Sequence, residues 1–361
     1  MTIRLDTAAE GLALPPISMP WTAPPGPGEA VEIVPGILWA RLPLPMKLDH
    51  VNIYALDEGD SWTLIDTGLN WRKGRDAMEA LLAGPLSGKP VRRVILTHHH
   101  PDHIGMLGRF AAEGAEVLAS RVAWLMGRML TLDPQDRPTE AQIAFRRRAG
   151  VTGTALEAYA SERPFNFADC VAPIPLGFTA LEEGASLEAG GRQWQVRLGE
   201  GHAPAHVTLW HEVAGLIIAG DQMLATISPN IGVYPTEPAA DPLGGWLASC
   251  RHFRTALSEG GVEDPLVLPG HHLPFTGLAR RLDQLIENHE NALDRIMAAL
   301  AAKPATATEL FDPIFRRPIG DAEFGLALVE AVAHANHLHR LGAVAGKMRP
   351  DGSVEWYPVA G

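Results

Sequence analysis

The chain has few cysteines and no long apolar run, and these absences exclude several classes of protein. Only two cysteines, Cys170 and Cys250, occur in 361 residues, and neither belongs to a Cys-x-x-Cys pair or lies beside the histidine motifs described below. Nothing in the sequence requires them to pair, so we expect a reduced, cytoplasmic protein. No stretch of about 20 apolar residues is present to span a membrane. Residues 1–13 carry Asp6 and Glu10 and lack the apolar core of a secretory signal.

Positive charge is also scarce. The chain has 30 Lys and Arg against 42 Asp and Glu, which gives a formal net charge of −12. Because nonspecific binding to nucleic acid depends on Lys and Arg at the phosphates, this balance disfavours a nucleic-acid partner, and it says little about small-molecule substrates. With 46% hydrophobic and 20% charged residues, the chain has the composition of a globular protein with a sizeable core.

Histidine, in contrast, is concentrated in one stretch. Residues 97–103 read Thr-His-His-His-Pro-Asp-His. They follow the apolar run 94–96 and precede a helix-like segment at 104–110, so they lie on a strand-to-helix loop, where open α/β sheets place their sites. Neutral imidazoles and a carboxylate are ligands that borderline divalent metals prefer. The alternative, a chance histidine cluster on a surface loop, loses weight because further motifs follow.

Three shorter motifs come later in the chain. They are Gly-His-Ala-Pro-Ala-His at 201–206, Ala-Gly-Asp at 219–221 and Pro-Gly-His at 269–271. The candidate ligands in all of these motifs come just past the ends of apolar runs that we expect to be strands. This shared placement predicts that residues far apart in the sequence meet at one rim of a sheet.

The four motifs in this order resemble the signature of the metallo-β-lactamase superfamily, over roughly residues 31–275. The resemblance implies an α/β protein folded as an αββα sandwich. It also implies seven metal ligands in two groups that share one member. These are His98, His100 and His202 for one metal, Asp102, His103 and His271 for the second, and Asp221 for both. Because the set has no cysteine, it resembles the glyoxalase II-like and thioesterase-lactonase hydrolases of the superfamily.

The resemblance implies two divalent metal ions, with zinc in first place and iron or manganese as alternatives. Two such ions would acidify a shared water from a pKa of about 15.7 towards 7 and turn it into a bridging hydroxide nucleophile. Asp102 is expected to orient this hydroxide and to shuttle its proton to the leaving group. His99, His206 and His272 match positions that are not ligands, and we expect them around the site or in its pocket.

Two further features are expected near the metals, each with a structural alternative of similar weight. Asp66-Thr67-Gly68 resembles a landmark of the superfamily that hydrogen-bonds the first metal loop, although Asp66 could merely cap a turn. Tyr234 closely follows Asp221 in the sequence and could donate to an oxyanion, although loop packing would explain it equally well. The same alternatives apply to His272 as a residue that binds substrate.

We expect the chain to have three parts: a Pro-rich arm at 1–30, a metallo-β-lactamase-fold catalytic domain at 31–278, and a helix with a small module at 279–361. Strands are expected at 31–34, 37–42, 51–56, 62–68, 91–96, 194–198, 207–211, 216–219 and 265–268. Helices are expected at 72–83, 104–112, 119–131, 139–149, 153–162 and 279–302. The arm is expected to pack along the body rather than across a second subunit.

The segment between the first two motifs is a helical insertion, where relatives on one scaffold can vary their substrate pocket. Leu125 and Met129 lie on an apolar face that we expect in the core rather than in a substrate lid. Residues 146–148 are three arginines, expected on a solvated helix face, with an anionic substrate group as the alternative.

The last part resembles the winged-helix tail of some superfamily members. Helices are expected at 308–315 and 322–341, and two strands at 344–348 and 354–359 around the turn at 350–352. Some tailed relatives process RNA, but residues 303–361 hold six Lys and Arg against seven Asp and Glu, so a role in packing or in a homodimer is expected. His289 is expected to be a hydrogen-bonded core residue, and His334, His337 and His339 are expected to be structural or exposed.

The leading hypothesis is a metal-dependent hydrolase that cleaves a small ester, thioester or lactone. A β-lactam hydrolase has the same ligand set, but the missing signal peptide counts against it. An RNA-processing nuclease is disfavoured by the charge, and a noncatalytic sensor by the complete set of ligand positions.

Overall fold

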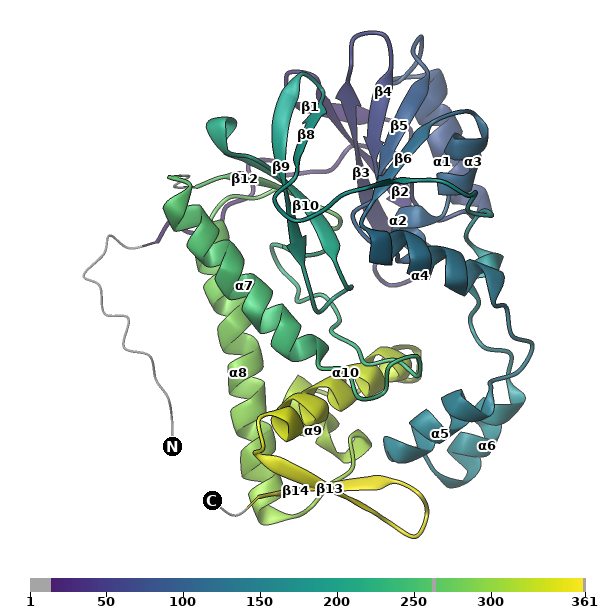
Figure 1. Cartoon of the computed structure of the whole chain (residues 1–361), viewed down its shortest axis with the longest axis vertical. Coiled ribbons are helices and arrows are strands. Elements are labelled where there is room, and N and C mark those ends of the chain that lie inside the picture. The colour runs from purple at the N-terminus through teal and green to yellow at the C-terminus, as the bar shows by residue number, and fades with distance from the viewer. Residues whose placement is uncertain (1–13, 262–263, 360–361) are drawn as a thin grey trace.

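The computed structural model of the chain describes residues 14–261 and 264–359. It contains two large mixed β-sheets (Figure 1). The strands of the first are β1 (Ala30–Val34), β2 (Ile37–Pro43), β3 (His50–Asp57), β4 (Trp62–Ile65), β5 (Val91–Ile95), β6 (Glu116–Ala119) and β7 (Thr179–Ala180). The strands of the second are β8 (Ser186–Ala189), β9 (Arg192–Gly199), β10 (His206–His211), β11 (Leu216–Gly220) and β12 (Leu266–Pro269). The spatial orders are β1-β2-β3-β4-β5-β6-β7 and β12-β11-β10-β9-β8.

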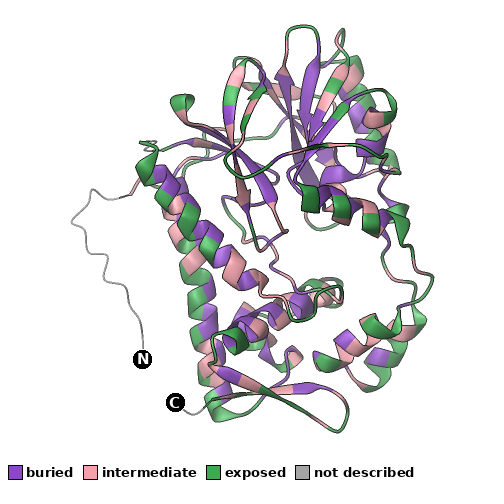
Figure 2. Cartoon of the chain, in the orientation of Figure 1, coloured by how far each residue is buried: buried purple, intermediate pink, exposed green. Residues whose placement is uncertain are grey.

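The two sheets pack face to face, and helices cover their outer faces. Trp39 of the first sheet and Trp194 of the second are fully buried in one core between the sheets. The main helices are α1 (Arg72–Ala83), α2 (Pro101–Ile104), α3 (Leu107–Ala112) and α4 (Arg121–Leu132) on the first sheet, and α7 (Pro242–Glu259) and α8 (Leu278–Ala302) on the second. The expected αββα sandwich is therefore confirmed, and its buried strands and helix faces are visible in Figure 2.

The chain directions in the sheets bring several strand ends to one rim. β4 pairs in parallel with β5, and β11 pairs in parallel with β12. Because parallel strands end at the same edge of a sheet, the loops after them open side by side. The motifs at 97–103, 219–221 and 269–271 lie on or at the start of such loops, and the motif at 201–206 lies on the loop between the antiparallel strands β9 and β10.

The expected helix at 104–112 begins earlier and is broken. Pro101 opens α2 as its first residue, a position where the missing N–H of proline costs nothing. The chain then turns at Gly105, where a Cβ would meet the carbonyl oxygen of Gly68 and the backbone of Leu69 and Asn70 well inside contact distance. Only glycine fits this approach. Gly105 keeps helical backbone angles (φ −53°, ψ −42°), and the break between α2 and α3 falls at Met106 (φ −101°, ψ 9°).

Two expectations about helices were wrong or incomplete. The helix α7 was not among the expected helices. Gly244 and Gly245 in its first turn lower helix propensity, and burial of Trp246 and Phe253 on one face of the helix stabilises it. The apolar face of α4 is only partly in the core. Its Leu125 is 52% exposed and its Met129 is 44% exposed.

The insertion continues with α5 (Glu140–Arg148) and α6 (Gly153–Ser161), close to their expected positions. The C-terminal part contains α9 (Phe311–Phe315), α10 (Asp321–Arg340) and an antiparallel pair of strands, β13 (Val344–Met348) and β14 (Val354–Pro358). Among these elements α9 and β14 pack on α8, while α10 packs on α7, α9 and β13 (Figure 1). No helix within residues 14–261 and 264–359 combines the length and apolar character needed to cross a membrane.

The described part of the N-terminal arm packs on the body. Arg280 donates hydrogen bonds to the carbonyl oxygens of Leu14 and Pro15, and Ser18 pairs with Thr276. Residues 1–13 of the expected arm lie outside the described residues. Both cysteines are buried and free.

Two histidines are buried where α8 meets α10, which leads to a prediction about acid stability. Burial lowers the pKa of His289 to about 3 and of His334 to about 4. In the unfolded chain both would take up protons near pH 6.5, so the unfolded state binds more protons and unfolding becomes easier as the pH falls from about 6.5 to 4. We expect the urea midpoint to fall across this range, and to fall less in His334→Asn.

The exposed residue His252 provides a control, because His252→Asn should keep the wild-type slope. If His334→Asn shows the same dependence on pH as the wild type, the acid sensitivity does not come from this buried residue.

Candidate metal centre

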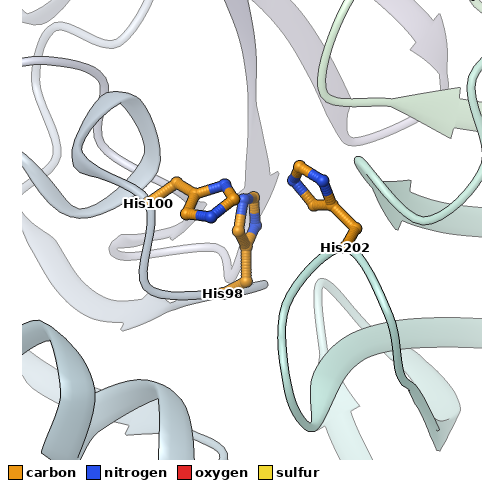
Figure 3. A group of neighbouring side chains, drawn as sticks. All are labelled: His98, His100 and His202. Atoms are coloured by element: carbon orange, nitrogen blue, oxygen red, sulfur yellow. The ribbon is translucent and has the colours of Figure 1, made fainter. Parts of the chain in front are cut away.

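The four motifs meet at the shared rim of the two sheets. His98 and His100 follow β5, while His202 follows β9. Figure 3 shows these three side chains pointing toward one another, and their ring centroids are 4.5–5.0 Å apart. Asp221 follows β11, and His271 follows β12. The structure thus brings together all seven residues that the sequence assigned as ligands.

The candidate ligand atoms form three overlapping groups. These are His98, His100 and His202; His98, His103 and Asp221; and Asp102, His103 and His271. Within each group the atoms lie within 4.8 Å of one another. Oδ1 of Asp221 lies 3.5 Å from Nε2 of His103, and its Oδ2 lies 3.5 Å from Nε2 of His202 and 3.1 Å from Nε2 of His271. A carboxylate in this central position could bridge two cations.

The surroundings of the centre shift the pKa values of three of its histidines in opposite directions. Burial, reinforced by neighbouring histidines, lowers the pKa of His98 and His100 well below the usual range, so both rings are neutral, as metal ligands must be. Burial also opposes charge on His271, but the carboxylates of Asp221 and Asp102 outweigh it and raise its pKa to about 10. A divalent cation would have to displace this proton, so metal uptake at this part of the centre is coupled to proton release.

Several buried polar atoms of the centre have no hydrogen-bond partner among the described residues. They are Nε2 of His98, His103 and His202 and Oδ1 of Asp221. An unpaired buried polar atom costs about 1–3 kcal/mol, and native proteins leave few of them. All four are nitrogen or oxygen donors of the kind that zinc, iron and manganese accept. The residues therefore fit a divalent metal.

Asp66 forms hydrogen bonds with the loop of the first motif, residues 97–103. One carboxylate oxygen accepts the backbone N–H of Thr97 at 2.8 Å, and the other accepts the Thr97 hydroxyl at 2.7 Å and Nδ1–H of His103 at 2.7 Å. These bonds hold the His103 ring with Nε2 toward the centre, which is how outer partners orient a metal-binding imidazole. The expected role of the Asp66-Thr67-Gly68 segment is confirmed.

Two other supports were missed by the sequence analysis. Nδ1–H of His271 donates to the backbone carbonyl of His50 at 2.7 Å, and Nδ1–H of His202 donates to the backbone carbonyl of Asn230 at 2.9 Å. A backbone carbonyl carries no signal in the sequence, so neither residue could be identified without the fold.

The three histidines that matched non-ligand positions surround the centre. His206 accepts the backbone N–H of Asp221 at 3.2 Å, and its ring stacks on His98 with centroids 4.6 Å apart. His99 is buried, and burial lowers its pKa to about 4. The backbone N–H of His272 donates to Nε2 of His50 at 2.9 Å. Substrate binding by His272 stays a prediction.

Tyr234 lies beside the insertion helices and α10. It lines a cavity of about 360 Å³ together with Arg146, Tyr159 and Phe165, and the described lining includes none of the seven ligand residues. The Arg146 guanidinium lies over the Tyr159 ring, 3.8 Å from its centroid. The role of Tyr234 in substrate binding stays a prediction.

Gly270 leaves no room for a side chain at the centre, and this can be tested. A Cβ there would overlap Oδ1 of Asp221 and lie 2.9 Å from Cε1 of His103. We expect Gly270→Ala to push the carboxylate aside and to lower kcat/KM about 100-fold, the typical cost of a 1 Å misplacement. Gly320→Ala is the matched control, because a Cβ there meets nothing within 4 Å. Equal kinetics for the two variants would show that Asp221 need not be held where the structure places it.

Comparisons with known proteins agree with this geometry. Residues 46–303 match the model of the metallo-beta-lactamase superfamily, and residues 293–359 match the model of a metallo-beta-lactamase-like C-terminal domain. "Probable metallo-hydrolase YqjP" of Bacillus subtilis is 27% identical over 311 residues, which cover 85% of this chain and 93% of that protein.

Two solved structures resemble the whole chain. A beta-lactamase domain protein from Burkholderia ambifaria is 30% identical with a TM-score of 0.84, and the match covers 95% of this chain and 97% of that one. A metallo-beta-lactamase family protein from Thermus thermophilus is 28% identical with a TM-score of 0.74, covering 91% and 100%. The chain belongs to the metallo-beta-lactamase superfamily.

Proposed function

We propose that this chain is a hydrolase that uses two divalent metal ions, zinc in first place, to cleave a small ester, thioester or lactone. The observation that carries the proposal is the meeting of three groups of nitrogen and oxygen donors around Asp221. The printed name of the Bacillus subtilis relative, a probable metallo-hydrolase, supports the general activity. The substrate class rests on the cysteine-free ligand set, which resembles that of the thioesterase and lactonase hydrolases.

Divalent ions held by these residues would acidify a water for attack at neutral pH and polarise the carbonyl oxygen of the substrate. We assign the transfer of the proton to Asp102. Its Oδ2 lies 3.4 Å from Nε2 of His271 and 3.7 Å from Nε2 of His103. Burial works to raise the pKa of Asp102, but the two histidines outweigh it and lower the pKa, so the carboxylate is ionised at neutral pH. It can accept a proton from the attacking water and deliver it to the leaving group.

Exposure indicates the side from which substrate approaches. Five of the seven candidate ligands are buried, whereas His100 and Asp102 are partly exposed. We propose that substrate enters past these two residues, which brings its leaving group next to the Asp102 carboxylate.

The test is a substrate panel on protein loaded with zinc: an acyl thioester, a lactone, an aryl ester and the β-lactam nitrocefin. We expect turnover of at least one of the first three, and a fall in kcat of about 10² to 10⁴ in Asp102→Asn, the usual worth of general acid–base catalysis. Turnover of nitrocefin alone would overturn the substrate class in favour of a β-lactam hydrolase. A fully loaded protein that turns over none of the four would contradict the proposal.

We also propose that residues 31–278 form the catalytic domain and that residues 279–361 form a helix with a winged-helix-like module. The antiparallel pair β13 and β14 after α10 supports the resemblance to a wing. A cytoplasmic location and a homodimer are part of the same proposal.

A further inference from the structure

The metal ligand His202 depends on a loop that the C-terminal part of the chain holds in place. His202 lies on the loop after β9, and its Nδ1–H donates to the carbonyl of Asn230 at 2.9 Å. This bond fixes the tautomer and leaves Nε2 facing Oδ2 of Asp221 at 3.5 Å. Since the acceptor is a backbone carbonyl, the orientation of His202 depends on whatever fixes the backbone at Asn230.

The side chain of Asn230 is anchored to α10. Its Nδ2 donates to Oε2 of Glu330 at 2.8 Å and to the carbonyl of Leu326 at 3.1 Å. The backbone makes a second attachment three residues later, where Val233 N–H donates to the carbonyl of Val329 at 3.1 Å. All three partners lie in the segment 293–359 that matches the C-terminal domain, outside the motifs of the metal centre.

A series of side-chain contacts through α8 also connects α10 to the loop that carries Asn230. Nδ1–H of His334 donates to the carbonyl of Glu330 at 2.8 Å. Nε2 of His334 lies 3.4 Å from Nδ1 of His289 on α8, and Nε2 of His289 lies 3.2 Å from the hydroxyl of Ser228, two residues before Asn230. The contacts form a closed circuit: loop to α10, α10 to α8, and α8 back to the loop.

His289, Glu330 and His334 are close enough together to hold a metal ion, but their bonding differs from that of the catalytic centre. Each of their ring nitrogens has a hydrogen-bond partner within the circuit. The Nε2 atoms of His98 and His202, in contrast, have none among the described residues. These side chains therefore satisfy their hydrogen bonds without a cation, and the network links the loop to α10 and α8.

We propose that Glu330 is a positioning residue for the metal ligand His202: through Asn230 it fixes the carbonyl that orients the His202 ring, so the C-terminal domain forms part of the metal centre. The inference rests on the proposed function only in taking His202 as a ligand, and it does not depend on the substrate. Removing the acceptor at position 330 frees the Asn230 side chain, and the loop then holds His202 less firmly.

The experiment measures metal affinity by competition with a chromophoric chelator, using zinc and cobalt(II), in the full-length protein. We expect Glu330→Ala to weaken the affinity of one site about tenfold, the low end of the effect of losing an outer partner of a ligand, and to change the cobalt absorption spectrum. Glu330→Gln still offers Asn230 an acceptor and should restore wild-type affinity. Glu323→Ala is the matched control. Glu323 is another glutamate of α10, and its carboxylate bonds only Lys47 and Arg317 among the described residues.

Wild-type affinity and spectrum in Glu330→Ala would overturn the proposal, as would an equal loss in Glu330→Gln and Glu330→Ala. If Glu330→Ala fails to fold, Asn230→Ala tests the same link, since it removes the anchored side chain and keeps the carbonyl. A third metal ion that is lost with His334→Asn would also overturn it, because the circuit would then be a metal site. These readouts need no substrate, so a failure of the proposed hydrolysis is distinguishable from a failure of this inference.

Discussion

His98→Ala is expected to abolish hydrolysis, lowering kcat/KM by at least about 10³-fold. His98, like His103, belongs to two of the three ligand groups, is fully buried, and has an Nε2 with no hydrogen-bond partner among the described residues. Its removal takes a donor from the group that contains His202 and from the group that contains Asp221, the carboxylate expected to be shared by the two metals. Dialysis against a strong chelator should cause the same loss in the wild type, and added zinc should restore activity only there.

His99→Gln is the matched control for metal content. His99 is the next residue in the same motif and is also buried, but it stands in no ligand group of the described residues. We expect His99→Gln to keep the wild-type metal stoichiometry while His98→Ala loses it. Turnover that survives both His98→Ala and chelation would reject metal-dependent hydrolysis.

Asp66→Asn is expected to weaken metal binding 10- to 100-fold and to lower the free energy of unfolding by about 1–3 kcal/mol. The two carboxylate oxygens of Asp66 accept three hydrogen bonds, from the backbone and hydroxyl of Thr97 and from Nδ1 of His103. An amide at this place turns one acceptor into a donor, which leaves buried groups unpaired. Asparagine tolerates the left-handed backbone of this position (φ 61°), so the backbone itself should not be the cause of the effect.

Urea unfolding and chelator competition measure the two parts of this prediction. Asp57→Asn serves as the control, since Asp57 forms a partly exposed ion pair with Lys89 at the end of β3, an interaction worth at most about 1 kcal/mol. If Asp66→Asn retains wild-type affinity for zinc, the buried hydrogen bonds to Thr97 and His103 do not organise the metal loop.

The residues that meet at the candidate centre could be found in the sequence because they are local signals, and their role as metal ligands, which the resemblance implies, stays a prediction. The ligands of the first motif are neighbours in the chain, and each later motif directly follows an apolar strand, so both the donors and their placement at strand ends could be read from the residues. The αββα sandwich was implied by the resemblance of the four ordered motifs to the superfamily, and it is confirmed.

The parts that could not be predicted depend on contacts between distant residues. Asn230 and Glu330 are 100 positions apart, and neither belongs to a pattern that indicates a partner. The prediction that Leu125 and Met129 are buried was wrong for a similar reason. Both follow helical spacing, but the packing of other segments decides which apolar residues of α4 are covered. The helix α7 was not predicted; its glycines disfavour a helix locally, and the tertiary burial of Trp246 that stabilises it is not visible in the sequence.

The central claim is that seven side chains from distant parts of the chain form one centre for two divalent cations, with Asp221 shared between them. Calorimetric titration of the metal-free protein with zinc, checked by elemental analysis, tests it most directly. We expect two zinc ions per chain in the wild type, one in His271→Ala, and weakened binding of both in Asp221→Ala. A wild-type protein that binds no zinc, or an Asp221→Ala variant that still binds two ions with unchanged affinity, would contradict it.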